Sequence, residues 1–136
     1  MPLAELDCVL QYVAAPGWRT PVAARFSYRS SDPYGVHVTF HTEQDPVSWV
    51  FARELLSEGT VRPSGIGDVR LWPGGGEQAD LLFLEVFSPY GQALFTVPLD
   101  VVTPWLARTY HLVPAGFEGA SLDLDGELSK LLGEVA

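Results

Sequence analysis

The sequence predicts an α+β fold built from antiparallel strands and a few helices. Three observations lead to this prediction. Short segments of alternating apolar and polar residues follow one another, and turns rich in proline and glycine separate them. Two segments with helical spacing each follow a run of such strands. The chain has 136 residues, 47% hydrophobic and 18% charged, which suits one packed domain over residues 1–136.

Four strands are expected in the first half, joined by short connections that favour an antiparallel meander. The expected strands are residues 6–13, 21–30, 36–42 and 47–51. Turns are expected at 14–17, 31–35 and 43–46, where proline fixes φ and glycine allows a positive φ. A short helix over 52–58 follows, with Gly59 just past its C-terminus in the position that favours glycine.

The second half repeats this order of meander and helix. After a loop at 62–67, strands are expected at residues 68–72, 81–87 and 92–97. Their connections are the glycine-rich segment 73–76 and the turn 88–91. Apolar residues then recur at helical spacing over residues 99–110, with Pro104 early in the helix, where a missing N–H costs least. The fold is therefore predicted as a meander plus helix, twice.

A last amphipathic helix is expected at about residues 123–135. Its apolar stripe follows the spacing i, i+4, i+7, i+8 and i+11, and consists of Leu124, Leu128, Leu131, Leu132 and Val135. A short terminal helix is marginal in water, so this stripe must pack against something. Two outcomes stay open. The helix completes the core of its own domain or of a sister subunit, or it inserts into a groove of a partner protein.

Charge and cysteine content exclude several classes of function. The net charge is −9, from 17 acidic and 8 basic residues, which disfavours nucleic-acid binding because such binding needs concentrated Lys and Arg. The only cysteine, Cys8, forms no internal disulfide and no thiol cluster for a metal. We therefore expect a cytoplasmic protein, without a signal peptide or a transmembrane segment.

No motif of catalytic or cofactor chemistry occurs in the sequence. The glycine-rich segments lack the lysine or the following helix that phosphate binding requires. His37 and His41 lie four residues apart on an expected strand, about 13 Å from each other and too far to share one metal ion. The sequence predicts a protein that is not an enzyme and that holds no metal and no cofactor.

One polar group of residues is a candidate binding surface. If the second and third strands pair, Arg25 and Arg29 share a sheet face with His37 and His41. A positive face on an acidic protein could bind an acidic partner or single-stranded nucleic acid. The alternative interpretation is an ordinary solvated sheet face.

Six blocks of sequence, in order along nearly the whole chain, resemble the SsgA-like proteins. They are residues 32–42 (DPYGVHVTFHT), 47–59 (VSWVFARELLSEG), 62–73 (RPSGIGDVRLWP), 88–94 (SPYGQAL), 108–114 (RTYHLVP) and 122–128 (LDLDGEL). The last block is most similar to the SsgB branch of this family.

The resemblance implies a regulator of sporulation-specific cell division in actinobacteria. It implies a Whirly-like fold, a homo-oligomer of three copies and no catalytic residues. It further implies a role at division septa, where the protein helps to localise or assemble the FtsZ ring together with an SsgA-type paralogue. The Whirly-like fold also suggests an alternative, a module that binds single-stranded nucleic acid.

Overall fold

Over residues 3–42, 45–65 and 67–120, which are the residues that the structure describes, the computed structural model contains seven strands and two α-helices, and residues 118–120 are also helical. In chain order the elements are β1 (Leu3–Ala15), β2 (Trp18–Arg29), β3 (Asp32–His41), β4 (Val47–Ala52), α1 (Arg53–Gly59), β5 (Val69–Pro73), the short 3-10 helix η1 (Gly76–Gln78), β6 (Leu81–Ser88), β7 (Gly91–Pro98) and α2 (Leu99–Leu112). The predicted α+β class and the repeated order of meander and helix are confirmed. None of the helices within the described ranges has the length and apolarity to cross a membrane.

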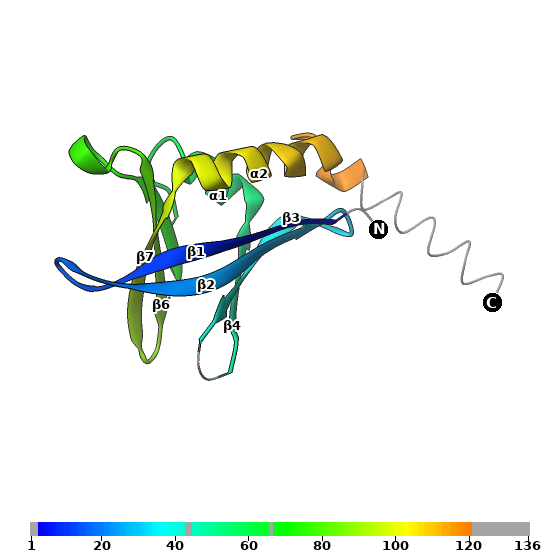
Figure 1. The fold of residues 1–136 in the computed structure, drawn as a ribbon. Coiled ribbons are helices and arrows are strands. Elements are labelled where there is room, and N and C mark those ends of the chain that lie inside the picture. Colours follow the sequence, from blue (N-terminus) through cyan, green and yellow to red (C-terminus); the bar gives the residue numbers. More distant parts are fainter. Residues whose placement is uncertain (1–2, 43–44, 66, 121–136) are drawn as a thin grey trace.

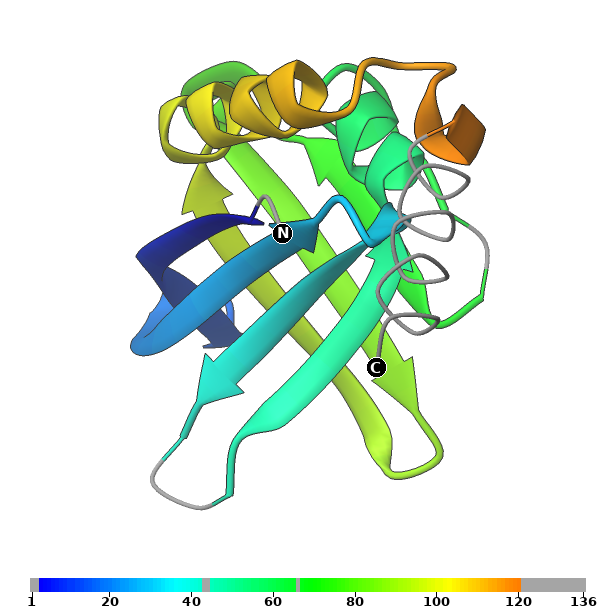
Figure 2. The ribbon, with the colours of Figure 1, turned by 90° about the vertical axis from the view of Figure 1, so that its right-hand side faces the viewer.

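The two meanders join into one antiparallel sheet of order β4-β3-β2-β1-β7-β6-β5. The junction is short, because β1 pairs with β7 only at Gln11 with Thr96 and at Tyr12 with Phe95. The sheet curls strongly, so the β3–β4 and β6–β7 hairpins extend from the β1–β2 ribbon as two facing walls (Figures 1 and 2). Both helices lie at the same end of this curled sheet.

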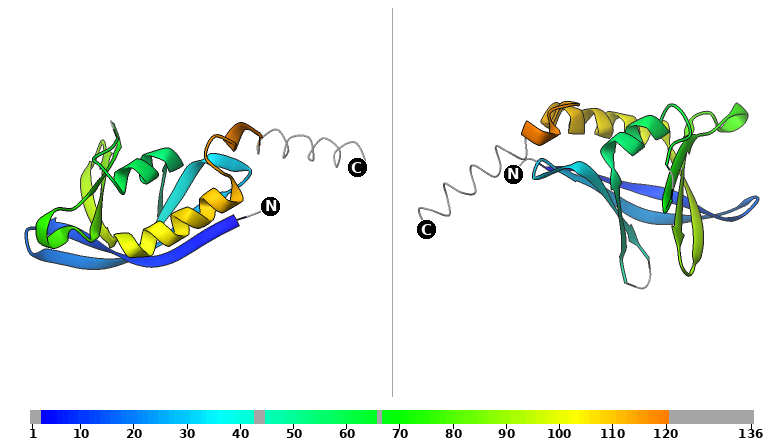
Figure 3. Two further views of the ribbon diagram at one scale, coloured as in Figure 1. Left: turned by 90° about the horizontal axis from the view of Figure 1, so that it is seen from above. Right: turned by 180° about the vertical axis from the view of Figure 1, so that it is seen from behind.

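The core lies between the inner face of the sheet and the two helices. On β2 and β3 the predicted alternation is confirmed: Ala24, Phe26 and Tyr28 are buried, as are Val36 and its alternating partners along β3. Seen from above, α2 runs along β1 (Figure 3), whereas α1 contacts β3 and β4 at one end of the strand order and β5 at the other. Burial of these apolar side chains is the main term that stabilises the fold.

The predicted turn at residues 31–35 is wrong. The turn between β2 and β3 is only Ser30 and Ser31, and Asp32 already pairs with Arg29. Proline is tolerated at the start of a strand because few ladder hydrogen bonds are required there. Pro33 has no partner on β4, because the pairing of β4 with β3 starts at Gly35. Pro33 and Gly35, the two residues that favour a turn, therefore both fit within β3.

The role predicted for Gly59 is also wrong. Helix α1 includes Gly59 and is followed by Thr60, which has a right-handed conformation, and Gly59 has no positive φ. A Cβ atom at this position would lie 2.5 Å from the Cβ of Leu71 on β5. Glycine is therefore required for the close approach of α1 to β5 and not for a left-handed cap.

Two further segments differ from expectation or fall outside the described residues. Helix α2 extends to Leu112, two residues beyond the predicted end, and the glycine-rich connection after β5 contains the 3-10 turn η1. The predicted helix at 123–135 lies outside the described residues, and so does part of the predicted turn at 43–46.

Candidate protein-binding surfaces

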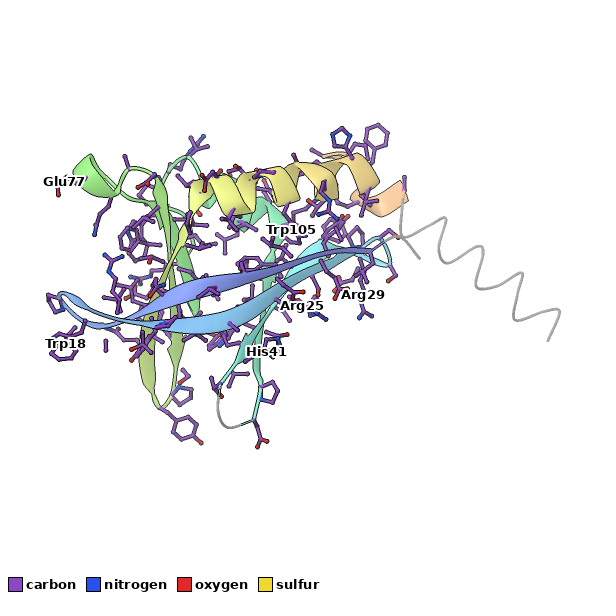
Figure 4. All side chains as sticks on the ribbon, in the orientation of Figure 1. Trp18, Arg25, Arg29, His41, Glu77 and Trp105 are labelled. Carbon is purple, nitrogen blue, oxygen red and sulfur yellow. The ribbon has the colours of Figure 1, made fainter. Side chains whose placement is uncertain are left out.

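The outer face of β2 and β3 brings the four predicted surface residues together. In the register of these strands, Arg25 pairs with Thr39, Ser27 with His37 and Ala23 with His41. Arg29 and His37 line one cavity of about 380 Å³, together with Ser27, Ser31, Asp32 and Thr39. Figure 4 shows Arg25, Arg29 and His41 on the side of the β1–β2 ribbon away from α2, whereas Trp105 lies beneath α2. We call this surface the polar face.

Carboxylates neutralise much of the positive charge expected on the polar face. Asp7 on β1 accepts two hydrogen bonds from Arg25, at 2.7 Å from Nε and 3.2 Å from Nη2, and Glu5 lies 3.4 Å from Arg25 Nη1. His37 Nε2 lies 3.0 Å from an Asp32 carboxylate oxygen. The polar face is therefore mixed in charge, which corrects the expectation of a positive face.

These contacts shift the ionisation of the central pair. The hydrogen bond from Arg25 lowers the pKa of Asp7 below 3.8, and the same bond raises the pKa of Arg25. Among the described residues, Arg29 and His41 have no ion-pair partner. Arg29 therefore remains available to a partner as a cation, and His41 as an imidazole that can donate or accept a hydrogen bond.

We expect Asp7→Asn to reduce stability at neutral pH but not in acid. The folded-state pKa of Asp7 lies below its unfolded value, so its contribution is present above about pH 4 and is lost as pH falls through the folded pKa. Urea unfolding at neutral pH and at about pH 3 gives the free energy of unfolding of the variant and of the wild type. The difference between these two free energies should disappear in acid. Glu77→Gln is the matched control, since Glu77 is distant from the polar face (Figure 4) and has no ion-pair partner among the described residues. An equal gap at both pH values would contradict the prediction.

An apolar groove opens at the end of the sheet opposite the helices. It encloses about 330 Å³ between the β3–β4 and β6–β7 hairpins, and Phe40 and Phe95 stack at its floor with ring centroids 4.5 Å apart. Its walls include Trp49 and Val86, and its rim carries Tyr90, which is 99% exposed. No charged side chain is among the described residues that line the groove. No local pattern of the sequence indicates this groove, because its walls come from two hairpins that are distant in the chain.

A buried arginine is a second feature that no sequence pattern indicates. Arg53, the first residue of α1, is 1% exposed. Its Nη1 donates hydrogen bonds to the backbone oxygens of Thr109 and Val113, at 2.9 and 2.7 Å, and its Nη2 donates to Glu118 at 2.9 Å. These bonds satisfy carbonyl groups at the C-terminal end of α2 and fix α2 to α1.

Aromatic rings enclose the same guanidinium group. The Cζ atom of Arg53 lies 3.9 Å from the ring centroid of Tyr110 and 4.7 Å from that of Tyr28, which are cation–π distances. The pKa of Glu118 is lowered, first by a hydrogen bond from its own backbone N–H and further by Arg53. The hydrogen bonds of Arg53 join α1, α2 and the chain after α2, so its role is structural.

The remaining candidate groups show no arrangement for catalysis. Burial raises the pKa of the Cys8 thiol to about 11, so the thiolate that would act as a nucleophile is scarce at neutral pH. Within the described ranges, no three His, Cys, Asp or Glu side chains gather closely enough to hold a metal ion. What the surface offers is a mixed-charge face and an apolar groove, which are features of protein recognition.

Comparison with known proteins points in the same direction. Residues 22–118 match the family model described as "Streptomyces sporulation and cell division protein, SsgA". The chain is 45% identical over 131 residues to a protein of Salinispora tropica named sporulation-specific cell division protein SsgB, covering 94% of this chain and 92% of that protein. A Streptomyces coelicolor protein of the same name is 44% identical, with 92% of each chain covered.

Solved structures of similar proteins share the fold. The crystal structure of an SsgA-like sporulation-specific cell division protein from Thermobifida fusca superposes with a TM-score of 0.85, 37% identity and 95% coverage of each chain. A structure from a study of SsgB mutations and longitudinal cell division in Streptomyces coelicolor gives a TM-score of 0.84 and 39% identity, with 88% of this chain covered.

Proposed function

Because this chain belongs to the SsgA family of sporulation and cell division proteins, and is a non-enzymatic cell division protein of the SsgB type, we propose that it acts as an adaptor. In this role it is a cytoplasmic protein at division septa. There it helps to localise the FtsZ ring or promotes the assembly of that ring. An SsgA-type paralogue is its second proposed partner. The observation that supports the proposal is sequence identity. This chain is about 45% identical, over more than nine-tenths of each chain, to two proteins named sporulation-specific cell division protein SsgB.

The described surface supports an adaptor, since it offers two distinct sites of recognition. The apolar groove is shaped to take uncharged side chains of a partner segment. The polar face combines ion pairs with one available cation, Arg29, and one available imidazole, His41, an arrangement that gives specificity and orientation. We propose that an acidic surface of the partner contacts the polar face.

Direct binding to FtsZ tests the proposal. We expect the purified protein to sediment together with FtsZ polymers, and a fluorescent fusion in the native host to coincide with FtsZ at septa. Arg29→Glu should weaken both, because it reverses an available charge of the polar face. Arg62→Glu is the matched control, since Arg62 is exposed, lies outside the polar face and has no ion-pair partner among the described residues. Absence of co-sedimentation together with absence from septa would refute the adaptor role.

A titration with single-stranded DNA tests the alternative function. The net charge of −9 and the carboxylates of the polar face oppose association with phosphates, so we expect only weak binding that disappears with added salt. Sub-micromolar binding of single-stranded DNA at physiological salt would favour the nucleic-acid-binding function over the adaptor function.

We further propose that the protein is a homo-oligomer of three copies. Within the described sheet, β4 pairs with a strand on one side only, whereas the outer edge of β5 is partly covered by a bridge between Ser64 and Leu71. Exposed strand edges such as that of β4 are usually paired or covered. The number three rests on the family resemblance. Light scattering at micromolar concentration should give three times the chain mass of 14.9 kDa, and a monomer mass would contradict the proposal.

A further inference from the structure

A small apolar surface with basic neighbours lies where the described chain ends. Leu3 at the start of β1 and Leu112 at the end of α2 are 44% and 38% exposed. With Ala4, Arg108 and His111 they line a cavity of about 250 Å³. Residues 108, 111 and 112 share one side of α2, because they are spaced i, i+3 and i+4. We call this surface the terminal corner.

The terminal corner presents one positive charge, that of Arg108, which no described carboxylate neutralises. Within the described ranges, neither Arg108 nor His111 has an ion-pair partner. Phe117, five residues after the end of α2, is 60% exposed, so the chain leaves this corner with a further unburied apolar side chain. The start of β1 and the last described residues, 116–120, lie at this same end of the molecule (Figures 1 and 3).

The chain beyond residue 120 has the complementary chemistry. Its sixteen residues carry four acidic side chains and one lysine, and the apolar stripe that includes Leu124, Leu128 and Leu131. The last described residues lie beside Arg53 and Tyr34, at the same end of the molecule as the corner, and as a helix sixteen residues would extend about 24 Å from there. The apolar groove is a poorer match, because it lies at the opposite end of the sheet from the helices and no basic side chain is among its described lining residues.

We propose that the terminal corner is the docking site of the protein's own C-terminal segment, residues 121–136, within the same chain. The leucine stripe covers Leu3 and Leu112, and the acidic side chains lie near Arg108 and His111. The segment then contributes to its own domain, and a partner that needs the leucine stripe must displace it from the corner. The docking itself is independent of the adaptor role, since it concerns the isolated protein.

A nitroxide label on the C-terminal segment tests the docking. In the Cys8→Ala background, Ser129→Cys places the only thiol off the leucine stripe, so labelling leaves the stripe intact. We expect the label to weaken the NMR amide signals of Leu3, Arg108 and Leu112. The amide of Gln92, beside the apolar groove, should keep its intensity. Uniform signals, with no loss at the corner, would overturn the proposal.

Mixing isotopes decides which chain supplies the segment. Nitroxide-labelled chains without ¹⁵N are mixed with unlabelled ¹⁵N chains, so any loss of signal then arises between molecules. Docking within one chain predicts no loss in the mixture. The loss in the mixture is compared with the loss when one chain carries both the nitroxide and ¹⁵N. An equally strong loss would mean that the segment of a second copy occupies the corner, and this would overturn docking within one chain.

Two sets of variants separate docking from chance proximity. Arg108→Glu should reduce the effect of the label at Leu3, whereas Arg62→Glu should leave it unchanged. In the unlabelled wild-type background, Leu128→Ala combined with Leu131→Ala should lower the melting temperature and change the Leu3 and Leu112 amide shifts. Lys130→Ala, off the stripe, is the matched control. Unchanged melting and unchanged shifts in the double variant would contradict the docking even if the labelled protein failed to fold.

Discussion

Replacing Arg53 with methionine is expected to lower the free energy of unfolding by about 3–5 kcal/mol. Methionine fills much of the same volume but donates no hydrogen bond. The backbone oxygen of Val113 would then remain buried without its donor, that of Thr109 would keep only the bond from the Val113 N–H, and the Glu118 carboxylate would lose Arg53. A fully apolar replacement of a buried ion pair can be neutral, but here two of the acceptors belong to the backbone and cannot be replaced.

Thermal unfolding measures this loss, which we expect to lower the melting temperature by on the order of 10 °C for a domain of this size. Arg53→Lys should lie between wild type and methionine, because lysine keeps the charge but not the planar fork that reaches three acceptors. Arg62→Met, at an exposed arginine, should change stability by less than about 0.5 kcal/mol. If Arg53→Met melted like Arg62→Met, the cluster that joins α1 to α2 would have no stabilising role.

Replacing Trp105 with alanine should cost about 3–5 kcal/mol, because it removes the largest buried side chain between α2 and the sheet. Trp105 is 2% exposed and packs edge-on against Phe26, with ring centroids 5.7 Å apart. Helix α2 would be left above a cavity.

Trp105→Phe should cost far less than Trp105→Ala. The indole Nε1 is buried and has no hydrogen-bond partner among the described residues, so phenylalanine also removes an unsatisfied donor whose burial costs about 1–3 kcal/mol. That gain offsets much of the smaller loss of volume. Urea unfolding of both variants compares them directly, and equal losses of the free energy of unfolding would contradict the prediction.

The sequence determined the fold class, because each local pattern was consistent with its final environment. Alternation along β2 and β3 correctly separated the buried Phe26 and Val38 from the exposed Arg25. The repeated order of meander and helix followed from spacing alone. The errors fell on Pro33 and Gly59, where a proline or glycine was assigned the role it most often plays in a turn or cap.

The family, too, could be identified from the sequence, because its motifs are long, ordered and spread along the chain. The sequence also placed Arg25, Arg29, His37 and His41 on one face, since strand register follows from short connections. It could not give the charge of that face. Asp7 and Glu5 neutralise Arg25 from β1, and only the pairing of β1 with β2 brings these carboxylates beside it.

Tertiary structure alone decided the apolar groove, the burial of Arg53 and the terminal corner. Each of them joins residues that are distant in the chain: Phe40 with Phe95, Arg53 with Thr109, and Leu3 with Leu112. Local patterns report which side of a strand or helix is apolar, because that periodicity is set by backbone geometry. Which distant element covers that side depends on how the sheet curls and where its two halves pair, and in this protein the short junction between β1 and β7 sets that arrangement.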